Sequence, residues 1–185
     1  HSVLIMVMAM IYVPVSTATP ASAADEYDGL IAKWTANFTG GTGIDTSDPG
    51  VVVNITNTTK NAQNYWNDLI KTADRTYLFA DLSTQYPNQH ITDTYMRIKA
   101  MAVAYATEGS SLYQDAALLS DIMSALEWLN VNWYNDTTAY GTQSSDNNWF
   151  VWEIGAPWQL EDTMALLYSH LTADQMDRYN RAIEH

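Results

Sequence analysis

The sequence predicts an all-α protein built of antiparallel helical hairpins. Apolar residues recur at intervals of three and four along several segments, which places them on one side of a helix. Short clusters of Gly, Pro, Asn, Asp and Ser, which favour turns, separate these segments. No alternating apolar and polar stretch is long enough to predict a strand. Because short joints between amphipathic helices give antiparallel pairs, we expect about six helices in this arrangement.

Two helices are predicted in the N-terminal part of the chain. The acidic pair Asp25-Glu26 favours a helix start, and apolar residues follow it at i, i+4 and i+8. These apolar residues are Leu30, Trp34 and Phe38. A second helix is predicted over residues 61–71, where two pairs spaced at i, i+4 lie next to each other. The pairs are Tyr65 with Leu69 and Trp66 with Ile70.

Four further helices are predicted towards the C-terminus. Three of them show the apolar spacing at Tyr95, Ile98, Ala102 and Tyr105, then at Leu119, Ile122, Leu126, Leu129 and Trp133, and then at Leu160, Met164, Leu167 and Leu171. Pro157 precedes the third set, and proline is tolerated in a first helical turn. Residues 172–175 form a capping box that opens the last helix. Since this helix reaches His185 without a stop signal, we expect the chain to be truncated there.

Residues 1–24 have the pattern of a secretory signal peptide without its basic n-region. The apolar run from Val3 to Val13 has 11 residues, fewer than the roughly 20 that a transmembrane helix needs. It leads to Ala21-Ser22-Ala23, which matches an A-x-A cleavage site. We therefore expect cleavage after Ala23 or Ala24 and a secreted protein without membrane contact. The alternatives are a membrane anchor and a buried helix.

Composition excludes several classes of protein. With no Cys, the chain can form no disulfide, thiolate zinc site or cysteine nucleophile. Its 8 Lys and Arg against 21 Asp and Glu give a net charge of −13, which argues against a nucleic-acid partner. Its 47% hydrophobic content is too high for a disordered chain. We expect residues 25–185 to form a single domain and the protein to be a monomer.

The most informative segment is NNWFVWEIGAP at residues 147–157. Adjacent side chains on one short stretch cannot all face the core, so Trp149, Phe150 and Trp152 must be divided between interior and surface. Exposed neighbouring aromatics usually mark a binding site. Sugars suit such a site, because a pyranose presents C–H groups to an aromatic ring while an amide such as that of Asn148 binds its hydroxyls. The alternative is that all three aromatic rings belong to the core.

This segment resembles the Asn-Trp-Trp-x-Trp-Glu-Ile-Gly-x-Pro signature of polysaccharide lyase family 8, the family of hyaluronate, chondroitin AC and xanthan lyases. The flanking sequence is similar in the same order: DEYDGLIAKWTANFTGG at 25–41, DRTYLFADL at 74–82, GSSLYQDAALLSDIMSALEWL at 109–129 and RAIEH at 181–185. The resemblance implies that residues 25–185 are the N-terminal part of an α/α toroid, followed in the family by β-sandwich domains.

The resemblance also implies an enzyme, a lyase that cleaves uronic-acid-containing polysaccharides by β-elimination. A base removes the C5 proton of the uronate and the glycosidic oxygen leaves from C4. In the family an Asn, a His, a Tyr and an Arg on later helices do this chemistry. We expect all of them beyond His185, so no catalytic residue is assigned here. The mechanism requires no metal and no cofactor.

What transfers by motif position is the substrate-binding patch. Asn148, Trp149 and Phe150 are similar to the Asn-Trp-Trp that lines the family's cleft and stacks on substrate sugars. Phe150 stands where the family has a second Trp, which keeps a stacking face but loses the indole N–H. We expect Trp152 and Glu153 to pack and hydrogen-bond within the hairpin, Gly155 to form a turn and Pro157 to start a helix.

Other polar residues have structural interpretations that we prefer to catalytic ones. His90 and His170 could be bases or ligands, but no second His has metal-ligand spacing, so surface or capping roles are expected. Glu153, Glu161 and Asp162 could form the acid pair of an inverting glycosidase. A solvated first helical turn explains Glu161-Asp162 better. Arg75 and Arg97 are expected to pair with nearby acids on helix surfaces.

Three functions remain open from the sequence. The first is a secreted lyase acting on hyaluronan, chondroitin or xanthan, of which this chain is a fragment with the aromatic patch but without the catalytic residues. The second is a non-catalytic helical module that binds carbohydrate. The third is an α/α-toroid glycoside hydrolase, in which acids replace the His and Tyr chemistry.

Overall fold

The computed structural model describes residues 27–138 and 149–184. The predicted signal peptide and Asn148 lie outside these residues. The described residues form six α-helices and no strand, which confirms the all-α prediction. The helices are α1 (Asp28–Thr39), α2 (Pro49–Asp68), α3 (Gln89–Ala106), α4 (Ala116–Asn132), α5 (Ala156–Leu166) and α6 (Ala173–Glu184).

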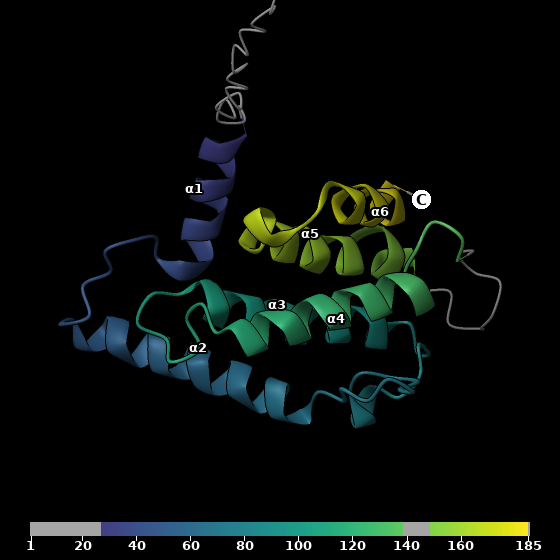
Figure 1. The fold of residues 1–185 in the computed structure, drawn as a ribbon, viewed down its shortest axis with the longest axis horizontal. Helices are drawn as coiled ribbons and strands as arrows, with labels where there is room; N and C mark the ends of the chain where they lie inside the picture. Colours follow the sequence, from purple (N-terminus) through teal and green to yellow (C-terminus); the bar gives the residue numbers. More distant parts are fainter. Residues whose placement is uncertain (1–26, 139–148, 185) are drawn as a thin grey trace, which may run out of the picture.

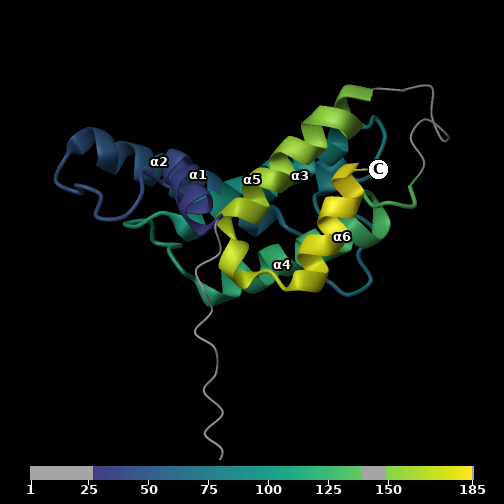
Figure 2. The ribbon, with the colours of Figure 1, turned by 90° about the horizontal axis from the view of Figure 1, so that it is seen from above.

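The helices are arranged as antiparallel hairpins. Figure 1 shows α2 along one side of the molecule, α5 and α6 along the other, and α3 and α4 between them. Successive helices from α2 to α6 reverse their direction, as the sequence predicts (Figure 1). Seen from above, α5 lies over α3 (Figure 2), and the two helices are in contact. None of the helices in the described part of the chain is long and apolar enough to cross a bilayer.

Helix α3 is the centre of the core because it contacts α1, α2, α4 and α5. Its buried side includes Tyr95, Ile98 and Ala102, three of the positions that the apolar spacing predicts. The buried face of α4 includes Ile122, Leu126 and Leu129, also as predicted. In contrast, Leu30 and Trp34 of α1 are exposed, although the indole N–H of Trp34 donates to Asp162 of α5.

Three helix boundaries differ from the prediction, the first being the end of α2, which lies at Asp68 and not at residue 71. Helix α2 begins at Pro49, twelve residues before the predicted start at 61, because the side chain of Asp48 accepts hydrogen bonds from the backbone N–H groups of Gly50 and Val51. Helix α5 ends at Leu166, and a short 3-10 helix (Tyr168–His170) follows before the capping box of α6. The predicted apolar stripe therefore continues past the end of the α-helix.

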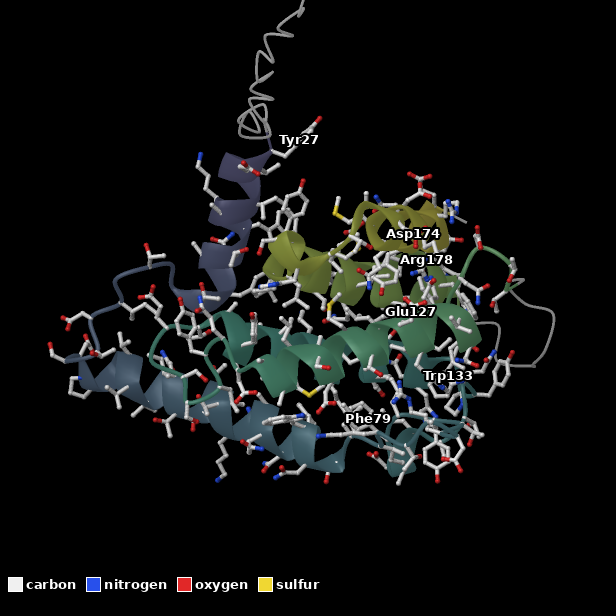
Figure 3. All side chains as sticks on the ribbon, viewed as in Figure 1. Tyr27, Phe79, Glu127, Trp133, Asp174 and Arg178 are labelled. Carbon is white, nitrogen blue, oxygen red and sulfur yellow. The ribbon has the colours of Figure 1, made fainter. Side chains whose placement is uncertain are left out.

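A charged cluster joins α4 to α6. The guanidinium of Arg178 donates two hydrogen bonds to the carboxylate of Glu127, at 2.8 and 2.9 Å, and a third to Asp174 at 3.0 Å. Figure 3 shows Arg178 between these two acids. The hydrogen bonds to Glu127 raise the pKa of Arg178. Because Glu127 is on α4 and Arg178 is on α6, this ion pair links the two helices.

Candidate functional site

The predicted aromatic patch lies at the start of a helical segment that continues into α5. Trp149 and Phe150 are helical, and a π-helical turn, Val151–Gly155, connects them to Ala156. The backbone N–H of Ala156 donates to the carbonyl of Val151, the i to i+5 bond of a π-turn. Single π-turns inside α-helices are frequent at functional sites, since they change the direction in which side chains point.

The three aromatic residues of the motif are divided between surface and core. Trp149 and Phe150 are 56% and 46% exposed, with ring centroids 6.2 Å apart in an edge-to-face arrangement. The ring of Trp152 instead stacks on Tyr134, with centroids 5.6 Å apart and planes at 28°. The hydroxyl of Tyr134 also donates to the backbone carbonyl of Trp152 at 2.9 Å. The expected division, with Trp152 packed inside, is therefore confirmed.

Gly155 allows the π-turn to approach α3 closely. A Cβ at this position would lie 2.7 Å from the Oγ1 of Thr92, closer than real side chains come. Gly155 is the last residue of the π-turn and lies within a helical segment. The prediction that it forms a turn is therefore wrong. Pro157 lies in the first turn of α5, as predicted.

A buried charge holds α5 against α1 and α3. The Asp162 side chain, 1% exposed, accepts from the indole N–H of Trp34 at 2.9 Å and from the Lys99 ammonium at 3.2 Å. The ammonium also lies 5.6 Å from the ring centroid of Phe38. The prediction of a solvated Glu161-Asp162 pair is therefore wrong for Asp162. The side chain of Glu161 is exposed, on the same helix.

The exposed side of the π-turn and α5 carries negative charge and no basic residue. Glu153 and Glu161 are both exposed, and no ion pair within residues 27–138 and 149–184 involves either of them. Within the same residues the Glu153 side chain also accepts no hydrogen bond, so the hydrogen bonding expected of it in the hairpin is not seen there. Burial raises the pKa of Tyr134, and the nearby carboxylates of Glu153 and Glu161 raise it further. Residues 100–177 contain no Lys or Arg at all.

Two further apolar residues that the sequence analysis did not single out are exposed beside this patch. They are Ile154, 40% exposed, and Trp158, 58% exposed. Together with Phe150 they recur every four residues along one helical segment. The signal was present in the sequence as an i, i+4, i+8 spacing, but such spacing usually indicates a buried face, and only the structure shows that this one is exposed.

The other candidate residues have the structural roles predicted for them, with one exception. His90 makes a 2.8 Å contact between its Nδ1 and the carbonyl of Thr84 near the start of α3, and His170 lies 3.1 Å from the hydroxyl of Tyr105.

Arg97 pairs with Asp81 as predicted. Arg75 instead donates to the carbonyl and hydroxyl of Ser124 on α4. No group of three His, Asp or Glu side chains in the described residues could hold a metal ion.

Comparison with known proteins supports the motif resemblance. Residues 34–185 match the model of the polysaccharide lyase family 8 N-terminal alpha-helical domain. A xanthan lyase from Bacillus sp. (strain GL1) is 36% identical over 165 residues, which cover 89% of this chain and 17% of that protein. A hyaluronate lyase from Thermasporomyces composti is 30% identical over 173 residues, or 94% of this chain and 21% of that protein.

Solved structures show the same fold. The xanthan lyase of Paenibacillus superposes with a TM-score of 0.80 at 40% identity, over 86% of this chain and 15% of that one. A chondroitin AC lyase from Streptomyces coelicolor A3, in complex with chondroitin sulphate, gives a TM-score of 0.76 at 34% identity, over 88% of this chain and 21% of that one. The chain thus spans about a fifth of the length of the relatives it matches.

Proposed function

This chain belongs to polysaccharide lyase family 8, and we propose that the protein that contains it is a secreted lyase that cleaves a uronic-acid-containing polysaccharide by β-elimination. The substrate class is hyaluronan, chondroitin or xanthan. Relatives named as xanthan and hyaluronate lyases, and a relative solved with chondroitin sulphate, support this range. The proposal of secretion depends on the signal-peptide pattern of residues 1–24.

The observation that carries this proposal is the exposed aromatic pair at the position of the family signature. Large aromatic side chains are normally buried, but Trp149 and Phe150 are about half exposed to solvent. A sugar ring can stack its C–H groups on the face of such a side chain. We propose that these two residues, together with Asn148, bind the polysaccharide.

The described residues contribute binding surface rather than the chemistry of elimination. The reaction needs a base for the C5 proton, a proton donor for the leaving oxygen and a group that neutralises the uronate carboxylate. Five of the eight Lys and Arg residues are already in ion pairs: Lys71, Arg97, Lys99, Arg178 and Arg181. We therefore propose that the catalytic groups and the cations that bind uronate lie beyond His185.

The test is the product of digestion by the full-length protein. Elimination leaves a sugar with a C4–C5 double bond, which absorbs in the ultraviolet, whereas hydrolysis leaves none. We expect this absorbance to rise on at least one of hyaluronan, chondroitin and xanthan. New reducing ends without the absorbance would indicate a glycoside hydrolase. Binding without any cleavage of the three polymers would indicate a carbohydrate-binding module. Either result, hydrolysis or binding without cleavage, would contradict the proposal.

A further inference from the structure

The aromatic pair is continued by a stripe of exposed apolar side chains along the same helical segment. The stripe consists of Phe150, Ile154 and Trp158, which are 46%, 40% and 58% exposed. Eight residues separate its ends, which at 1.5 Å per residue is about 12 Å. This length exceeds a single sugar ring, so the stripe is long enough for consecutive sugars of a polymer chain.

The π-turn keeps the stripe on one side of the helix. Two α-helical turns take about seven residues, so residues eight apart drift out of line on a regular helix. A π-turn holds about one residue more than an α-turn, so two turns that include Val151–Gly155 take about eight residues. Phe150 and Trp158 are therefore brought to the same face. The π-turn therefore has two effects: it lets Gly155 lie close to α3, and it aligns the exposed side chains of the stripe.

The surroundings of Trp158 favour an uncharged sugar. Glu153 and Glu161 flank the stripe with exposed carboxylates, and no Lys or Arg occurs between residues 100 and 177. A carboxylate or sulphate group bound between Glu153 and Glu161 would meet like charges, and the helical segment that carries the stripe holds no Lys or Arg to neutralise it. The hydroxyl and N–H groups of an uncharged sugar, in contrast, can donate hydrogen bonds to these carboxylates.

The stripe ends against α1. The next position along the same line is Asp162, whose carboxylate accepts from the indole of Trp34. Trp34 is itself 42% exposed, so α1 presents another aromatic side chain where it contacts α5. Continuity with the proposed substrate patch indicates the polymer as the occupant, because a sugar chain bound at Trp149 and Phe150 that follows α5 reaches Trp158.

We propose that Trp158 forms a second stacking position on α5, which binds an uncharged sugar residue of the polysaccharide while the uronate binds elsewhere. Trp158 is then a specificity-determining residue of the site, and Glu161 supports it by accepting hydrogen bonds from the sugar. This inference depends on the proposed function for its polymer class, but its test has a binding readout that does not need catalysis.

The experiment compares full-length wild type with Trp158→Ala and Trp158→Phe. We expect Trp158→Ala to weaken polymer binding and raise KM about tenfold, with kcat changed less than about twofold, because the ring binds substrate and transition state alike. Trp158→Phe should restore most of the affinity, since it keeps a stacking face. Val131→Ala is the matched control, because Val131 is an exposed apolar residue on α4 away from the stripe.

Charge preference is tested with chondroitin carrying or lacking sulphate on its hexosamine. Wild type should bind the unsulphated polymer several-fold more tightly, and Glu161→Gln should reduce that ratio. Unchanged affinity with a lowered Tm in Trp158→Ala would show that another part of the protein covers the stripe, and would overturn the inference. If wild type binds these polymers but releases no unsaturated uronide, the lyase proposal fails while the binding comparison still decides the role of Trp158.

Discussion

Trp149 and Trp152 are the same residue type three positions apart, yet they have opposite environments. Tyr134 decides the difference, because its ring stacks on Trp152 and its hydroxyl binds the backbone of the same residue. Trp149 has only Phe150 as a ring neighbour among the described residues and remains exposed. The sequence could predict that the cluster is divided. It could not predict the exposure of Trp158, because exposure depends on which helices pack beside α5.

Asp162 is the residue whose loss should destabilise the described helices most directly. Asp162→Ala leaves the Lys99 ammonium without its partner in a largely buried site and removes the acceptor of Trp34. We expect this change to lower the free energy of unfolding by about 3 kcal/mol. Asp174→Ala is the control, because Asp174 is an exposed partner of Arg178 and should cost less than about 1 kcal/mol. Urea denaturation of both variants measures the difference, and equal losses would contradict the role of Asp162.

Asp121 should make stability depend on pH in the acid range. Burial raises the pKa of its carboxyl, but hydrogen bonds from Lys71 and Trp66 lower it more, so the folded-state pKa lies below 3.8. Because the folded-state pKa is depressed, the stabilisation is fully present above pH 3.8 and is lost as the pH falls through the folded value. Asp121→Asn should therefore cost about 1 kcal/mol at pH 7. The cost should shrink as the solution is acidified, and a cost independent of pH would refute this assignment.

At the scale of elements, the helices built on apolar spacing were predicted, and α6 was predicted from its capping box, but the first half of α2 was not. The central parts of α3 and α4 follow from positions such as Ile98 and Leu126 that recur on one face. Most of α2 is rich in Val, Asn and Thr, which have low helix propensity, so the sequence indicated only its last part. Its true start depends on Asp48 and Pro49, a capping signal that spacing alone does not reveal.

The π-turn gives a testable prediction at this scale. Gly155→Ala would place a methyl group 2.7 Å from the Oγ1 of Thr92, so the π-turn and α3 must move apart. We expect a loss of about 1–3 kcal/mol in the free energy of unfolding. The second change Thr92→Ala removes the obstructing atoms and should recover most of this loss in the double variant.

Gly29→Ala serves as the control for this series. Gly29 lies in α1, where an added methyl group would meet no side chain within 4 Å, so alanine should be neutral or stabilise by up to about 1 kcal/mol. If Gly155→Ala is as well tolerated as Gly29→Ala, the close approach of the π-turn to α3 does not constrain the helix.

At the scale of the whole molecule, charge limits what these helices can bind alone. The chain carries a net charge of −13, and most of its basic residues are already paired with acidic side chains of the chain itself. An acidic surface repels an acidic polymer. We therefore expect residues 25–185, with their helical content confirmed by circular dichroism, to bind hyaluronan weakly. Tight binding that weakens steeply with salt would contradict this expectation.

The central claim is that the exposed aromatic pair binds the polysaccharide, and Trp149→Ala in the full-length enzyme tests it most directly. The measurement is KM for the cleaved polymer, read from the ultraviolet absorbance of the product, together with Tm. We predict that KM rises about tenfold while Tm stays within about 2 °C of wild type, because an exposed ring contributes to binding and little to the core. An unchanged KM with a clearly lowered Tm would show that Trp149 is a core residue and would contradict the account.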